Sequence, residues 1–187
     1  MDFLKRAIAA VFDFMQGIVV FLALLVMVYL FLFSPQEIDG ASMEPSFYNG
    51  EYVLTNKVLY KLRDPHRGEV VIFKSPRNKE IDFIKRIIAV PGETVRIAGG
   101  LVYVNGQLLP EVYLPSGTYT FGESFLKENQ QFTVPQGQYF VLGDNRPHSS
   151  DSRDFGPIAK EDFIGRAIVR YFPFNKTGVI PLPNYGM

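Results

Sequence analysis

The chain has 187 residues, with 19 lysines and arginines balanced by 19 aspartates and glutamates. This even balance gives no electrostatic basis for nucleic-acid binding, and we expect no nucleic-acid partner. The absence of cysteine excludes disulfides, a thiolate nucleophile and a sulfur-ligated metal site. The only histidines, His66 and His148, are too few for a histidine triad plus a metal site, and we interpret both as surface or loop residues.

The first predicted element is a transmembrane helix at residues 14–33. These twenty uncharged residues, at about 1.5 Å rise per residue, would cross the roughly 30 Å hydrocarbon core of a bilayer. Pro35 follows the stretch and cannot continue a helix. We therefore expect one retained anchor, preceded by a short N-terminal segment at residues 1–13.

The charges that flank this stretch predict its orientation. Lys5 and Arg6 precede it, whereas the first basic residue after it is Lys57. Because positive residues favour the cytoplasmic side, we expect a single-pass protein with a cytoplasmic N-terminus and an extracytoplasmic remainder.

Two other interpretations of the apolar stretch are a buried core helix and a cleaved secretory signal. A core helix should show polar residues at helical spacing, and none occur between Ile18 and Leu32. A signal peptide has an apolar region of about 7–15 residues, shorter than this one, although residues 39–41 could form a weak cleavage site before Ser42. The retained anchor is therefore favoured.

Residues 34–187 are predicted to form one mainly β domain, which is long enough for a core of its own. Gly99-Gly100 and Asn105-Gly106 are hairpin signals that predict a three-strand meander over residues 94–109. Residues 110–131 are expected to form an irregular, variable excursion. Short β-branched and aromatic runs predict strands at 52–54, 69–73, 81–90, 94–97, 101–104, 107–109, 131–134, 138–142 and 163–172.

Ser42 is a candidate nucleophile in a turn-like run nine residues after Phe33. A serine hydroxyl is a poor nucleophile unless a base removes its proton. With histidine scarce, lysine is the plausible base. Its unperturbed pKa of about 10.4 requires that it be desolvated in order to act at neutral pH.

Lys85 is the best candidate for that base. In a strand, period-two alternation places Phe83, Lys85 and Ile87 on one face and Arg86 on the other. The lysine then has apolar neighbours. The alternative is an ordinary cross-strand salt bridge with a snorkelling stem, and this strand alone favours that alternative.

A polar and charged stretch at residues 143–156 follows an apolar predicted strand directly. Such a stretch can be a solvated loop rich in turn formers. It can also supply hydroxyls that orient a neutral amine and Asp–Arg pairs that fix a loop. Composition alone favours the solvated loop.

Four stretches in this order resemble the bacterial type I signal peptidases, serine/lysine-dyad membrane proteases that remove leader peptides. The resemblance covers nearly the whole chain except residues 110–131 and implies an antiparallel β-sheet or partly open barrel of the signal-peptidase type. The stretches are the anchor, Ser42-Met43 with Pro45, Phe83-Ile84-Lys85-Arg86 with Val90-Pro91-Gly92-Glu93, and Gly143-Asp144-Asn145-Arg146 with Ser149-Ser150-Asp151-Ser152-Arg153.

The resemblance implies a role for each matching site residue. Ser42 would be the acylating nucleophile, with its backbone N–H in the oxyanion hole, and Lys85 would be the general base. Ser149 would orient the lysine amine. The supporting residues would be Asp151 and Arg153, joined as an ion pair, together with Asp144 and Arg146. The substrate cleft would be lined by Ile38, Met43, Phe47, Phe83 and Ile84.

The resemblance also implies the substrates and the location. The substrates would be signal peptides of exported preproteins, cut after small residues at sites of the A-x-A type, with no metal or organic cofactor. The enzyme would lie in the bacterial inner membrane, in contact with the lipid bilayer and indirectly with the export machinery. One departure is Gly40, where some family members have a serine that assists the oxyanion hole.

Three other functions are alternatives to this one. A non-catalytic membrane-anchored β domain could bind exported chains without cutting them. A self-cleaving repressor-like serine/lysine protease shares the chemistry but would require a soluble DNA-binding N-terminal region. The signal peptidase of the endoplasmic reticulum uses histidine at the position of Lys85.

Overall fold

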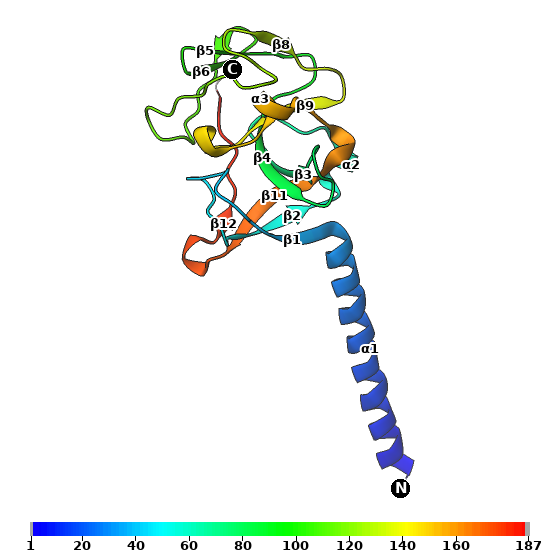
Figure 1. Cartoon of the computed structure of the whole chain (residues 1–187). Coiled ribbons are helices and arrows are strands. Elements are labelled where there is room, and N and C mark those ends of the chain that lie inside the picture. Colours follow the sequence, from blue (N-terminus) through cyan, green and yellow to red (C-terminus); the bar gives the residue numbers. More distant parts are fainter. Residues whose placement is uncertain (1, 186–187) are drawn as a thin grey trace.

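The computed structural model describes residues 2–185, in which one long helix carries a β domain (Figure 1). Helix α1 (Asp2–Leu32) is continuous, so it includes the described part of the predicted N-terminal segment as well as the apolar stretch. It ends two residues before Ser34, and strand β1 (Phe33–Glu37) follows at once. The change from helix to strand therefore occurs just ahead of Pro35.

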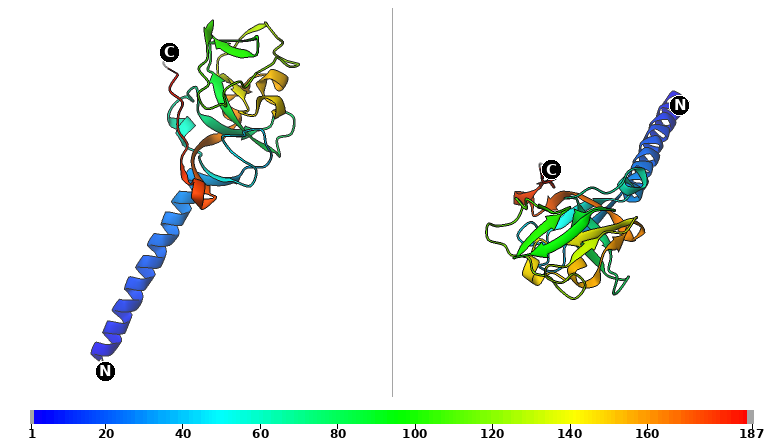
Figure 2. Two further views of the ribbon diagram at one scale, coloured as in Figure 1. Left: turned by 90° about the vertical axis from the view of Figure 1, so that its left-hand side faces the viewer. Right: turned by 90° about the horizontal axis from the view of Figure 1, so that it is seen from above.

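Helix α1 projects away from the β domain in each of the views in Figures 1 and 2. Residues Lys5–Leu32 are long and apolar enough to cross a membrane, and none of their most apolar window is buried inside the protein. A core helix would be covered by the rest of the chain. The core-helix interpretation is therefore wrong.

Strand β1 connects the helix to the β domain without a linker. It pairs with β2 (Tyr52–Asn56) from Phe33 opposite Asn56 to Glu37 opposite Tyr52. The sequence did not predict β1, because Ser34-Pro35 interrupts the apolar pattern. Cleavage of a leader before Ser42 would remove this whole strand from its sheet, which argues for a retained helix.

The first sheet is antiparallel throughout, in the order β1-β2-β11-β3-β4-β9-β10, with β12 paired to β11. β10 and β12 were not predicted, since two-residue strands leave no alternating pattern. The remaining strands of this sheet are β3 (Val70–Lys74), β4 (Asp82–Ala89), β9 (Gln138–Leu142), β10 (Ile158–Ala159), β11 (Phe163–Phe172) and β12 (Gly178–Val179).

The second sheet has the order β7-β6-β5-β8 and contains the predicted meander. The hairpin residues Gly99, Gly100, Asn105 and Gly106 have φ of +59°, +80°, +52° and +78°, the left-handed region that such turns require. The strands are β5 (Thr94–Ala98), β6 (Leu101–Val104), β7 (Gln107–Leu108) and β8 (Gln131–Thr133).

The helices after α1 are all a single turn or less, so the domain is mainly β as predicted. They lie in the connections between strands (Figure 1). They are α2 (Leu59–Leu62), η1 (Arg146–His148), α3 (Ser152–Phe155), η2 (Lys160–Asp162) and η3 (Phe174–Lys176).

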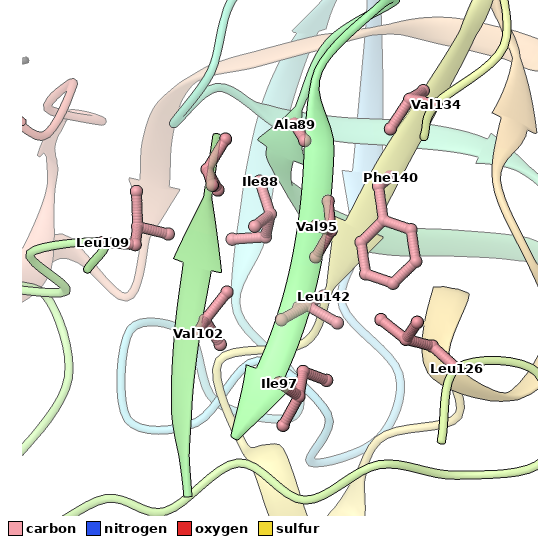
Figure 3. Close-up of a cluster of buried hydrophobic side chains, with 11 residues drawn as sticks. Ile88, Ala89, Val95, Ile97, Val102, Leu109, Leu126, Val134, Phe140 and Leu142 are labelled. Carbon is pink, nitrogen blue, oxygen red and sulfur yellow. The ribbon is translucent and has the colours of Figure 1, made fainter. Parts of the chain in front are cut away.

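Residues 110–130 contain neither helix nor strand, yet they contribute to the core. Leu126 is fully buried in a cluster built by β4, β5, β6 and β9. Figure 3 shows its side chain beside Phe140 and Leu142 of β9. The irregular segment is therefore packed on the domain.

This packing makes Leu126→Ala strongly destabilising. Removing a fully buried leucine side chain should lower the free energy of unfolding by about 2–5 kcal/mol. The matched control is Leu108→Ala, because Leu108 is 51% exposed on β7. Urea unfolding of the full chain in detergent measures both variants. Equal losses would contradict the packing described above.

Candidate active site

Ser42 and Lys85 are joined by a direct hydrogen bond. The Lys85 Nζ donates to the Ser42 Oγ at 2.7 Å and to the Ile84 carbonyl at 2.9 Å. Lys85 belongs to β4, and Ser42 belongs to the nucleophile loop, residues 38–51 between β1 and β2. Ser42 is partly exposed, so its hydroxyl is accessible to a substrate.

The Lys85 amine is buried without an ion pair. The residue is 3% exposed, and its amine lies 5.2 Å from the centre of the Phe83 ring. Burial lowers the pKa of Lys85 to about 8, against the opposing charges of Asp151 and Asp144. Among residues 2–185, no carboxylate lies within ion-pair distance of this amine. The cross-strand salt-bridge interpretation is therefore wrong.

Asn145 fixes the nucleophile loop to the polar loop, residues 143–151. Its backbone N–H donates to the Ser42 carbonyl at 3.1 Å, and its Nδ2 donates to the Ala41 carbonyl at 3.0 Å. A Cβ at Gly143 would overlap the Ser149 hydroxyl and the Ser42 carbonyl, so only glycine allows this approach. The sequence places Asn145 in a motif but did not indicate a role for it.

Ser149 is in the polar loop, but its predicted hydrogen bond to Lys85 is not formed. Its side-chain oxygen is buried and has no hydrogen-bond partner among the residues that the structure describes. The backbone carbonyl of Ser149 accepts from Arg153 at 3.3 Å. A role in orienting the amine stays a prediction.

Asp151 and Arg153 form a buried bidentate ion pair. Both N–H···O distances are 2.8 Å, and the two side chains are 0% and 2% exposed. Asp151 also accepts from the Gly143 backbone N–H at 3.1 Å, and Arg153 donates to the Arg146 carbonyl at 2.7 Å. The pair therefore fixes both ends of the polar loop.

Asp144 and Arg146 have different partners. Asp144 accepts two hydrogen bonds from Arg86, at 2.9 and 2.6 Å, and both side chains are buried. Arg146 pairs with Glu111 and donates to the Thr120 hydroxyl at 2.6 Å. The sequence did not indicate a role for Arg86 or Glu111. The available signal was that Arg86, next to Lys85 in a strand, must point to the opposite face.

A groove of about 340 Å³ lies beside the dyad. Of the five predicted cleft residues, Ile38, Phe83 and Ile84 line it together with Ser42 and Lys85. The structure does not place the other two among the lining residues. They are Met43 and Phe47, buried in the core cluster that also contains Ile38 and Ile84. Both histidines are exposed, as predicted, and His148 lies at the edge of the groove.

Gly40, the departure from the family pattern, has a backbone reason to be glycine. Its φ is +93°, a conformation that residues with a Cβ rarely adopt. Its N–H donates to the Asn49 side chain at 2.7 Å. A serine at this position would be strained, and the Gly40 N–H is already engaged.

Comparison with known proteins places this chain in a family. The model of the family "Signal peptidase, peptidase S26" matches residues 11–172. The chain belongs to this family.

The curated relatives agree with this assignment. A probable signal peptidase I-2 of Synechocystis is 39% identical over 80% of this chain and 68% of its own length. Signal peptidase I V of Bacillus subtilis is 38% identical over 82% of this chain and 94% of its own length. A crystal structure of a signal peptidase I from Enterococcus faecalis is 38% identical and covers 56% of this chain and 97% of its own, with a TM-score of 0.47.

The buried Arg86–Asp144 pair yields a stability prediction. Asp144→Asn would leave the Arg86 charge buried without its partner, which should cost about 3–5 kcal/mol of unfolding free energy. The control is Asp162→Asn, which breaks an ion pair with Lys79. The Lys79 and Asp162 side chains are 57% and 32% exposed, so this pair should contribute less than about 1 kcal/mol. Denaturant unfolding of the full chain compares them, and similar losses would refute the prediction.

Proposed function

We propose that this chain is a membrane-anchored serine endopeptidase that removes N-terminal signal peptides from exported preproteins, with Ser42 as nucleophile and Lys85 as general base. The class of reaction is inferred from the family and from the relatives of the chain. The observation that carries the dyad is the 2.7 Å hydrogen bond from a buried, unpaired Lys85 amine to the Ser42 hydroxyl.

The lowered pKa makes a neutral amine available. At a pKa of about 8, about a tenth of Lys85 is neutral at pH 7, compared with about one molecule in 3,000 at the ordinary value of 10.5. Neutral Lys85 takes the Ser42 proton as Oγ attacks the scissile carbonyl carbon, and the ammonium then protonates the departing amine. Water, deprotonated by Lys85, hydrolyses the acyl-enzyme.

An unpaired strand edge next to the dyad supports the substrate-binding mode. β4 pairs with β3 along Asp82–Arg86, but its pairing with β9 begins only at Arg86. On that side, residues 82–85 have no strand partner among residues 2–185, and they line the groove with Ser42. An extended leader peptide adds there as a strand. Ile38 and Ile84 line the groove, and we expect their apolar side chains to favour small side chains before the cut.

We place the enzyme in the bacterial inner membrane as a single-pass protein. In this arrangement, residues 1–13 are cytoplasmic, residues 14–33 span the bilayer and residues 34–187 form the extracytoplasmic catalytic domain. Lys5 and Arg6 on the N-terminal side support this orientation. The preprotein reaches the domain from the export machinery, with which contact is indirect.

Loss of either dyad member should abolish cleavage. Ser42→Ala removes the nucleophile and Lys85→Met removes the base, so each should lower kcat/KM by at least about 10³-fold. Cleavage of a model preprotein in detergent is followed with the cut site mapped by mass spectrometry. Lys79→Met, which removes a surface lysine 57% exposed, is the matched control. Full activity of Ser42→Ala would contradict the dyad assignment, whereas absence of cleavage by wild type would favour a non-catalytic binding domain.

Single cysteines test the orientation, because the natural chain has none. Glu80→Cys, in an exposed turn, should react with a membrane-impermeant maleimide from outside the cytoplasmic membrane. Ala7→Cys should react only after that membrane is permeabilised. The reverse pattern would contradict the proposed topology.

A further inference from the structure

A second cavity, of about 630 Å³, lies next to the nucleophile loop and is separate from the groove. The nucleophile loop contributes Glu44 and Pro45 to it, and the polar loop contributes residues 144–147. The irregular segment forms another wall, with Tyr119 and Phe121 among its residues. The proposed mechanism gives this cavity no role.

Asn145 connects the second cavity to the loop residues that line the groove. The groove is lined by residues 40–42 of the nucleophile loop, and the second cavity by residues 44 and 45 that follow them. Asn145 lines the second cavity, and its two hydrogen bonds hold the carbonyls of Ala41 and Ser42. The second cavity therefore adjoins the part of the nucleophile loop that directly follows Ser42.

The aromatic wall is exposed but firmly held. Tyr119 and Phe121 are 61% and 62% exposed, and their rings stack at 6.4 Å. Thr120 between them is 1% exposed: its N–H donates to the Gly100 carbonyl at 2.9 Å, and its hydroxyl accepts from Arg146 at 2.6 Å. The backbone that carries these exposed apolar rings is already fixed in the folded protein. Binding a ligand to them therefore costs little further conformational entropy.

The charges of the cavity also limit its ligand. The arginines that line it are neutralised, Arg146 by Glu111 and Arg153 by Asp151. Glu44 has no ion-pair partner within residues 2–185, and Glu123 lies 3.5 Å from Arg153. The cavity is therefore mostly apolar, with acidic groups in its walls, and disfavours acidic side chains.

We propose that this cavity binds the first residues of the mature chain, on the carboxyl side of the scissile bond, and prefers apolar side chains there. The proposal rests on the proposed function, since it takes Ser42 as the nucleophile and the groove as the site of the leader. It makes Tyr119 and Phe121 specificity-determining residues that do not touch the reacting atoms.

The test compares two peptide substrates with the same leader, one ending one residue after the cut and one continuing for six residues with leucines. Wild type should cleave the longer peptide with a kcat/KM about tenfold higher. The Tyr119→Ala/Phe121→Ala double variant should lose this preference and cleave the shorter peptide at the wild-type rate. Phe174→Ala, which removes an aromatic 83% exposed outside the cavity, should keep it.

The failures are distinguishable. If wild type cleaves neither peptide, the proposed function itself fails. If wild type cleaves both but shows no preference, or if the double variant retains the preference, the cavity is not the site for the mature chain and the proposed function stands.

Photocrosslinking gives a second readout that does not depend on the folding of the double variant. The Ser42→Ala enzyme is irradiated with the longer peptide carrying benzoylphenylalanine at the second position after the cut. The label should map to residues 115–123 or 144–147. The same probe three positions before the cut should label residues 82–85. Labelling of residues 82–85 from both positions would overturn the proposal.

Discussion

The buried contact between the Lys85 amine and the Ser42 hydroxyl is the constraint around which the other polar groups are arranged. Burial is what lowers the lysine pKa, but the carboxylates of Asp144 and Asp151 oppose it. Each of these carboxylates is bound by an arginine, Arg86 or Arg153. The two ion pairs therefore fix the polar loop and also limit the negative charge that acts on the amine.

The connection from helix to nucleophile is short and rigid. β1 begins directly after α1 and is paired with β2 along its whole length, and Ser42 follows five residues after Glu37. Because there is no flexible linker, the distance between the helix end and the nucleophile is fixed by the sheet. In the proposed membrane topology, this arrangement holds the nucleophile at a constant depth relative to the bilayer.

Local pattern predicted the fold well where alternation and turn residues agree. Residues 101–104, 138–142 and 163–172 form strands with the predicted bounds. β1 was not predicted, because Pro35 argues against a strand, although an edge strand tolerates proline. The site was less accessible to such reasoning. The strand containing Lys85 favoured a salt bridge, and the resemblance to a family, rather than the pattern, joined it to Ser42.

The partners of the polar loop could not be predicted, because they are distant in sequence. Arg86 and Asp144 are 58 residues apart, and Glu111 and Arg146 are 35 apart. Residues 110–131 matched no pattern, yet they supply Glu111, Thr120 and Leu126 to the site and core.

The most direct test of the lowered Lys85 pKa is a titration of ¹⁵N-lysine-labelled full-length enzyme by NMR. One signal, absent from Lys85→Met, should titrate with a midpoint of about 8. If every lysine signal titrates with a midpoint of about 10.4, Lys85 is not desolvated and the account is contradicted.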